Sequence, residues 1–202
     1  EPNVENLGLK EAGVKTKKNG TIIVDAMQST NVDNVFALGD VCGKAELTPV
    51  AIAAGRKLAA RLFNNEPYAK LDYNSIPTVI FSHPPIGTCG ISEEEAAEKY
   101  GAASLSVYTS RFTNMYHAMT ERKSPTLMKV ITVKPDEKVV GIHLFGIAVD
   151  EMMQGFGLAV KLGITKAQLD SVIAIHPTGA EEVVTMRGPR GYKNWLDVQP
   201  KL

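Results

Sequence analysis

The residue best suited to acid–base chemistry is His176. The apolar stretch 173–175 leads to it, and Pro177 restricts the chain directly after it. Glu181 follows shortly, and a carboxylate near an imidazole favours the charged ring and fixes its tautomer, as proton transfer requires. The alternative is structural: Thr178 and Glu181 have the spacing of a capping box, which leaves His176 as a loop residue. Spacing alone favours this alternative.

A second candidate is Asp40, which follows the apolar run 35–38 and Gly39. That run is typical of a buried strand, so the carboxylate would lie at a strand tip. A helix is expected to open with Thr48 as its N-cap and Pro49 at its first position. The carboxylate could accept hydrogen bonds from sugar-like hydroxyls, and free N–H groups at the helix start could donate to a carbonyl or an anion. A turn aspartate and an ordinary cap are the simpler interpretation.

Met115 and Tyr116 place two large, adaptable side chains in an otherwise polar loop. Exposed residues of this kind can form a binding surface, although core or interface packing is the commoner reason for them. The other histidines lack the setting of His176, and we expect structural roles for them: His83, His117 and His143.

Composition and charge argue against several classes of protein. The 202 residues contain 22 Lys and Arg and 22 Asp and Glu, so no basic surplus is available for a nucleic acid backbone. No apolar run approaches the ~18 residues of a membrane-spanning helix, and the first residues lack a signal-peptide pattern. We therefore expect no nucleic acid, membrane or metal as a partner.

The two cysteines, Cys42 and Cys89, are too few for a disulfide scaffold and form no CxxC pair. We expect both to pack as small apolar side chains in a reducing, cytoplasmic environment. No G-x-G-x-x-G motif follows a strand, so the sequence encodes neither a complete flavin domain nor a complete nicotinamide domain.

The elements that position these residues fall into two regions on either side of the polar stretch 64–75. We expect residues 1–73 to form a β/α segment, with a strand at 21–25 besides the elements around Asp40 and Thr48. Residues 74–190 are expected to form an α+β domain, an antiparallel sheet with helices on one side, followed by a tail at 191–202.

The α+β domain is predicted from alternating strand and helix signals. Ser92 should cap a helix running to about Tyr100, with glutamates in its first turn where the helix dipole favours them. Another helix is expected at 150–163, and shorter helices after Thr165 and Thr178. The expected strands are 77–81, 87–91, 105–110, 127–133 and 138–145, with a hairpin turn at 134–137.

Four segments resemble, in the same order, the glutathione reductase-like members of the pyridine nucleotide-disulfide oxidoreductase family. They are 31–42, 47–58, 81–87 and 176–182. The resemblance runs from about residue 1 to 187. It implies a dimerisation domain preceded by the central segment of a flavin-binding domain.

In that family, electrons pass from NADPH to FAD, then to a cysteine pair and then to the substrate disulfide. The resemblance implies that Asp40 holds the ribityl chain of the flavin and that the backbone N–H of Thr48 lies near the flavin pyrimidine. It also implies that His176 protonates the departing thiol, with Glu181 orienting it, in the active site of the partner subunit of a homodimer.

The implied substrate is glutathione disulfide. Arg56 matches an arginine that contacts a glutathione carboxylate, and Met115 and Tyr116 match residues that line the substrate pocket. Trypanothione reductase is a rival that Arg56 disfavours, because its pocket takes a cationic substrate. Thioredoxin reductase is disfavoured by the absence of cysteine from 188–202.

A stand-alone dimerisation module without catalysis is the alternative from another class. In the family, the flavin fingerprint, the redox cysteines and the nicotinamide domain precede the position of Glu1. The chain by itself is therefore expected to be inactive.

Overall fold

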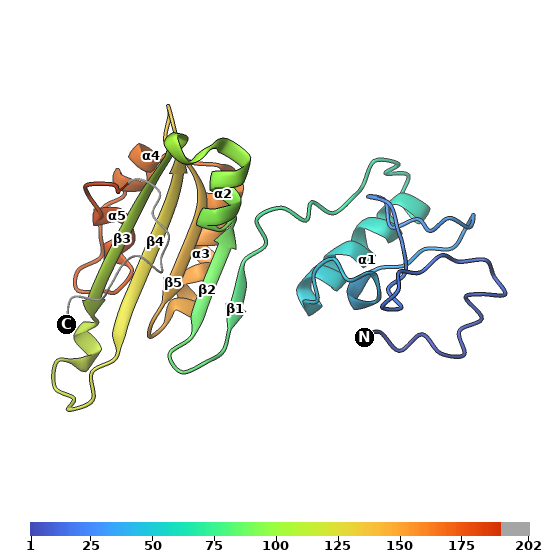
Figure 1. Cartoon of the computed structure of the whole chain (residues 1–202), viewed down its shortest axis with the longest axis horizontal. Helices are drawn as coiled ribbons and strands as arrows, with labels where there is room; N and C mark the ends of the chain where they lie inside the picture. The colour runs from blue at the N-terminus through green and yellow to red at the C-terminus, as the bar shows by residue number, and fades with distance from the viewer. Residues whose placement is uncertain (191–202) are drawn as a thin grey trace. The chain divides into compact units, whose positions relative to one another are not determined.

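The computed structural model describes residues 1–190 and divides the chain into two compact units. The first is Glu1–Tyr73 and the second begins at Asn74. The expected tail, 191–202, lies outside the described residues. Each unit is considered by itself (Figure 1).

The first unit has little regular secondary structure. It contains a short 3₁₀ helix, η1 (Gly39–Cys42), and one long helix, α1 (Thr48–Phe63). The strands expected at 21–25 and 35–38 are wrong: each has only a single isolated bridge, Thr16 with Ile22 and Ser29 with Phe36. Apolar sequence makes a strand only where a neighbouring backbone pairs with it residue after residue, and turn bonds dominate here.

A small apolar cluster holds the first unit together. Its buried members are Val14, Ile22, Ala37 and Cys42. Gln28 is also buried, and its side-chain amide has no hydrogen-bond partner within residues 1–190. In α1 the buried residues are Val50 and Ala54.

The second unit is built on a five-stranded antiparallel sheet in the order β1-β2-β5-β4-β3 (Figure 1). All five expected strands are confirmed, with ends that differ by at most three residues. A turn at 134–137 joins the last two, as expected, and a bulge lies between Ile131 and Thr132. The strands are β1 (Thr78–Ile80), β2 (Ile86–Gly90), β3 (Leu105–Thr113), β4 (Pro125–Val133) and β5 (Lys138–Phe145).

Helices cover both faces of this sheet, because buried side chains alternate along its strands. In β4, Met128 and Val130 pack with the cluster that includes α3 (Val149–Leu162), α4 (Lys166–Asp170) and α5 (Glu181–Thr185). Ile131 belongs to a second cluster with Ala96 of α2 (Glu93–Tyr100). The α+β class is confirmed, while α2 departs from the expected one-sided arrangement.

Two helix starts match their sequence signals. Ser92 and Glu95 form a complete capping box at α2, and Thr165 and Gln168 form another at α4. Gly157 of α3 lies against Pro77: a Cβ at this position would lie 2.4 Å from Cγ of Pro77. The small residue therefore allows close packing within this unit.

One first-turn glutamate of α2 has a role that the dipole argument did not foresee. The Glu93 side chain is fully buried, with its two carboxylate oxygens 2.7 and 2.8 Å from the guanidinium of Arg190. Lys129 of β4 donates to the same carboxylate at 2.9 Å. Burial raises the pKa of Glu93, but the hydrogen bonds from both cations outweigh it and leave the pKa below its usual value.

Candidate functional site

The structure brings His176 and Glu181 together just before and at the start of α5. Nδ1 of the imidazole lies 3.1 and 3.2 Å from the two carboxylate oxygens of Glu181. The backbone N–H of Glu181 donates to the Thr178 hydroxyl at 3.3 Å. One of the two hydrogen bonds of the expected capping box is therefore present. The prediction of a complete capping box is wrong, because the Glu181 carboxylate contacts the imidazole instead and Ala180 is the N-cap.

This contact decides which nitrogen of His176 carries a proton. A carboxylate at neutral pH only accepts hydrogen bonds, so Nδ1–H must be the donor. Nε2 is then left to give or take a proton, and the His176 side chain is 77% exposed, whereas that of Glu181 is 21% exposed. The arrangement suits a positioned acid–base group that a substrate can reach.

Neighbouring elements fix both ends of α5 and so position Glu181. At its start, the Ser110 hydroxyl of β3 donates to the Glu182 carboxylate at 2.8 Å. Just beyond its end, the buried Lys166 ammonium donates to the carbonyl oxygen of Met186 at 2.9 Å. These two contacts tie the short helix to the sheet and to α4.

The turn that carries Met115 and Tyr116 lies against the loop that carries His176. It forms η3 (Met115–His117), with the Asn114 side chain accepting from the Tyr116 N–H at 3.1 Å. A Cβ on Gly179 would lie 2.6 Å from Nδ2 of Asn114, so the two segments are in close contact. Met115 and Tyr116 are 63% and 68% exposed.

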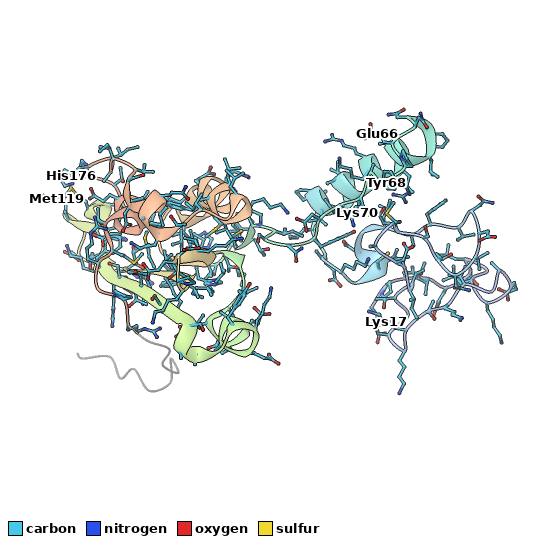
Figure 2. All side chains as sticks on the ribbon, turned by 90° about the horizontal axis from the view of Figure 1, so that it is seen from above. Lys17, Glu66, Tyr68, Lys70, Met119 and His176 are labelled. Carbon is cyan, nitrogen blue, oxygen red and sulfur yellow. The ribbon has the colours of Figure 1, made fainter. Side chains whose placement is uncertain are left out.

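Four predicted site residues are thus brought to one end of the second unit. Figure 2 labels His176 and another exposed residue of the second unit, Met119. Met119 is 96% exposed, and sequence reasoning missed it. The only available signal was its place four residues after Met115 in the same loop.

The remaining predicted site residues, Asp40, Thr48 and Arg56, belong to the first unit. Asp40 is exposed in η1, and a Cβ on Gly39 would lie 3.2 Å from Cβ of Ala51. Because η1 rests against the first turns of α1, it brings Asp40 near the start of that helix. Arg56 is exposed in the middle of α1.

The expectation that Thr48 caps α1 is wrong. Leu47 is the N-cap, with no side-chain cap bond, and Thr48 is the first helical residue. The carbonyl of Leu47 already accepts from the N–H groups of Val50 and Ala51, so the helix starts one residue earlier than expected. Since Pro49 has no N–H, the backbone N–H of Thr48 is the donor that the helix start presents.

Both cysteines are free and buried, as expected. Burial raises the pKa of the Cys42 thiol and of the Cys89 thiol, so both are protonated and unreactive at neutral pH. Residues 1–190 contain no cluster of three His, Cys, Asp or Glu side chains that could hold a metal ion. No helix in this range is long and apolar enough to cross a membrane.

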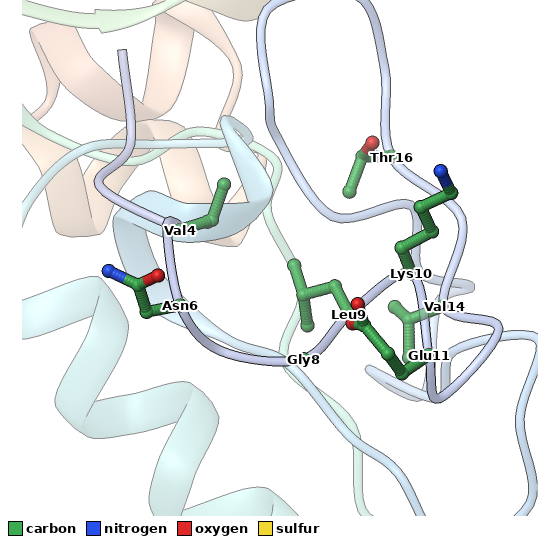
Figure 3. Close-up of a pocket in the computed structure, with 8 residues that line it drawn as sticks. All are labelled: Val4, Asn6, Gly8, Leu9, Lys10, Glu11, Val14 and Thr16. Atoms are coloured by element: carbon green, nitrogen blue, oxygen red, sulfur yellow. The ribbon is translucent and has the colours of Figure 1, made fainter.

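A pocket is also present near the start of the chain. It measures about 700 Å³ and occupies the first unit, where none of the seven predicted site residues lines it (Figure 3). Its wall is formed by residues near the start of the chain: Val4, Asn6, Gly8, Leu9, Lys10, Glu11, Val14 and Thr16.

Comparison with known proteins defines the class to which this fold and site belong. Residues 76–187 match the dimerisation domain of the pyridine nucleotide-disulphide oxidoreductases, and residues 1–55 match the pyridine nucleotide-disulphide oxidoreductase model. The chain belongs to the pyridine nucleotide-disulphide oxidoreductase family.

Two curated relatives are similar over nearly the whole chain. Glutathione reductase of Yarrowia lipolytica is 53% identical over 189 residues, which cover 93% of this chain and 40% of the relative. Glutathione reductase of Schizosaccharomyces pombe is 52% identical over 187 residues, or 92% of this chain and 40% of the relative. The chain spans about two fifths of their length.

A solved structure shares the fold. The HOCl-induced flavoprotein disulfide reductase RclA from Escherichia coli matches with a TM-score of 0.74 and 21% identity. The match covers 92% of this chain and 42% of that one.

Proposed function

We propose that this chain is part of a flavin-dependent, NADPH-using glutathione-disulfide reductase and supplies its acid–base pair, His176 and Glu181. The observation that carries the proposal is the 3.1 Å contact between Nδ1 of His176 and Glu181, which leaves an exposed Nε2. The similarity to glutathione reductases over 92–93% of the chain supports the choice of substrate.

Each residue of the pair has a distinct task in this proposal. Breaking a disulfide releases a thiolate, which leaves more readily when a proton reaches its sulfur as the bond breaks. Nε2 of His176 gives that proton and later recovers it, since an imidazole can both donate and accept a proton. Glu181 stabilises the charged ring and holds it in one orientation through Nδ1.

Two groups of the first unit could hold part of a flavin. The exposed carboxylate of Asp40 would accept hydrogen bonds from the ribityl hydroxyls, and the N–H of Thr48 would donate to a carbonyl of the pyrimidine ring. FAD would supply the electrons that reduce the disulfide, having received them from NADPH. The sequence has no G-x-G-x-x-G motif, so residues outside it would bind the two pyrophosphates.

Three residues are proposed to recognise the substrate. Arg56 would pair with a carboxylate of glutathione disulfide. Met115 and Tyr116 would contact the substrate beside His176. We further propose a cytoplasmic location, since both cysteines are unpaired.

We propose a homodimer formed through the second unit. Exposed large apolar side chains are numerous there, and their burial against a second copy would suit an obligate contact. They are Ile80, Phe81, Tyr100, Leu158, Leu162, Val172, Ile173 and Ile175, in addition to Met115, Tyr116 and Met119.

The acid–base role is tested by His176→Ala in the full-length protein that contains this chain. Turnover with glutathione disulfide should fall by ~10²–10⁴-fold, the usual contribution of a positioned acid–base group. Flavin reduction by NADPH should keep its rate, because that half-reaction does not use this proton. Rapid mixing separates the two half-reactions.

Two variants serve as controls for this experiment. Glu94→Ala alters an exposed side chain on α2, which covers the other face of the sheet from α5, and should leave turnover unchanged. Glu181→Gln keeps a hydrogen-bonding side chain and should lower turnover less than His176→Ala does. Equal slowing of both half-reactions in His176→Ala contradicts the acid–base role.

A further inference from the structure

A second pocket in the C-terminal unit has no part in the proposed chemistry. It measures about 300 Å³ and lies among the β1–β2 loop, the β3–β4 loop and the residues just before α3. Its apolar wall is formed by Pro84, Pro85 and Ile147. A volume of this size is at the lower end of small-molecule sites.

The polar lining of this pocket consists of hydrogen-bond donors that suit an anion. Arg122 is permanently charged, His83 and His117 can carry a proton, and Ser124 offers a hydroxyl. None of the lining residues within the described chain is acidic. Arg122 has no carboxylate partner within residues 1–190, whereas Arg187 pairs with Asp170 at 2.9 Å.

The β3–β4 loop, which supplies His117, Arg122 and Ser124, is held in place before any ligand arrives. The Thr120 hydroxyl lies 2.9 Å from the carbonyl oxygen of Arg122 and 3.3 Å from Nδ1 of His117. Lys123 donates to the carbonyl oxygens of His117 and Ala118, the latter at 3.0 Å. A preorganised loop reduces the ordering cost of binding.

We propose that this pocket binds a small organic carboxylate with a flat apolar body. The guanidinium of Arg122 can bind a carboxylate through two parallel hydrogen bonds, and the imidazole of His83 or His117 can donate a further one. Pro84, Pro85 and Ile147 bury the apolar body, which distinguishes such a ligand from bare phosphate.

The occupant would also contact the turn assigned to substrate recognition. The rings of His117 and Tyr116 meet edge to face, with centroids 5.2 Å apart. A ligand that holds the His117 ring therefore restrains the exposed Tyr116 ring. This consequence rests on the proposed function, but binding in the pocket does not.

The binding test uses the chain itself, because its four histidines give four resolvable imidazole signals in a proton–carbon NMR spectrum. Titration with benzoate should move the His83 and His117 signals to saturation. The signals of His143, which is bonded to the Ile91 carbonyl, and of His176 should stay in place. Equal movement of all four signals, or no saturation, overturns the proposal.

Matched variants and probes identify the groups responsible. Arg122→Gln should raise the benzoate Kd roughly tenfold, the loss of one charge-assisted contact. Arg111→Gln removes the same charge from a neighbouring pocket and should leave the Kd unchanged. An unaltered Kd in Arg122→Gln overturns the assignment.

Benzamide and inorganic phosphate complete the test. Benzamide has the same ring without the charge, and phosphate has the charge without the ring, so both should bind more weakly than benzoate. Benzamide binding as tightly as benzoate overturns the anion site, and phosphate binding as tightly overturns the apolar-body assignment. Failure of the His176 proposal leaves these outcomes unaffected, because no turnover is measured.

Discussion

The two units of this chain differ in how their largest buried polar side chains are accommodated. In the second unit, the buried carboxylate of Glu93 and the buried ammonium of Lys166 each have more than one partner. In the first unit, the amide of Gln28 is equally buried but has no partner within residues 1–190. A continuous strand ladder supports the polar groups of the second unit, whereas turns and single bridges surround Gln28.

This difference teaches that apolar patterning alone does not determine a sheet. Residues 35–38 and 127–133 both have apolar sequences typical of strands, yet only the second range pairs on both sides. Backbone groups that lack a strand partner form hydrogen bonds within turns instead. Segments held by turns open in smaller cooperative units than a sheet does. The two units should therefore differ most in how readily they open.

Hydrogen exchange should show the largest difference. Amides at the centre of β4 and β5, such as those of Val130 and Ile142, should exchange more slowly than those of residues 21–37 by roughly 10³-fold or more. The reason is that the sheet amides open only when their unit unfolds. Exchange followed by NMR on the intact chain measures this directly. Equal protection in the two ranges contradicts the comparison.

Replacing Glu93 by Met should give the next largest effect. The substitution leaves Lys129 and Arg190 without their buried carboxylate, so the free energy of unfolding of the second unit should fall by about 3 kcal/mol. Urea unfolding followed by NMR signals of each unit provides the measurement. Glu94→Met is the matched control, because Glu94 is exposed, and it should change stability by less than about 0.5 kcal/mol.

A pair of glycines in α3 tests packing in the same unit. Gly157→Ala places a Cβ 2.4 Å from Pro77 Cγ and should cost about 1–3 kcal/mol. Gly155→Ala meets nothing within 4 Å and should be neutral or stabilising by up to about 1 kcal/mol. Thermal or urea unfolding distinguishes them. A similar loss in both variants would mean that contact with Pro77 is not the cause.

The smallest effect is expected for Gln28→Met in the first unit, and its sign is opposite to that of Glu93→Met. Removing a buried amide that lacks a partner should raise stability by about 1 kcal/mol. The probe is again the urea midpoint reported by signals from residues 1–73. Destabilisation would indicate that the Gln28 amide is satisfied in solution, and would remove the contrast between the units.

Much of the second unit could be predicted from sequence because its signals are local. Alternation along the strands and the spacing of Ser92 and Glu95 each specify one structure. The same spacing at Thr178 and Glu181 misled, because His176 competes for the carboxylate and the spacing does not include it. Similarly, Glu93 and Glu94 are adjacent and chemically identical, and only the packing of α2 on the sheet decides which one is buried.

Only part of the site was predictable from the sequence. His176 and Glu181 could be paired from their proximity in sequence, but their contact with the Met115–Tyr116 turn depends on Gly179 lying against Asn114. The first unit contains an error of another kind. Residue type predicted Thr48 as the N-cap of α1, but Leu47 occupies that position. Which carbonyl accepts the first helical bond is a property of the folded chain, and no composition rule specifies it.

The pairing of Arg190 with β3 has a consequence for the exposed edges of the sheet. Its backbone pairs with Val107 through two hydrogen bonds of 2.9 and 3.0 Å, at the outer edge of β3. The opposite edge of the sheet is β1, which has only three residues. Open edges invite other chains to add strands, and short or occupied edges resist this. One edge is therefore partly sealed by the protein's own backbone and the other is too short to template growth, which protects the sheet from edge-to-edge aggregation.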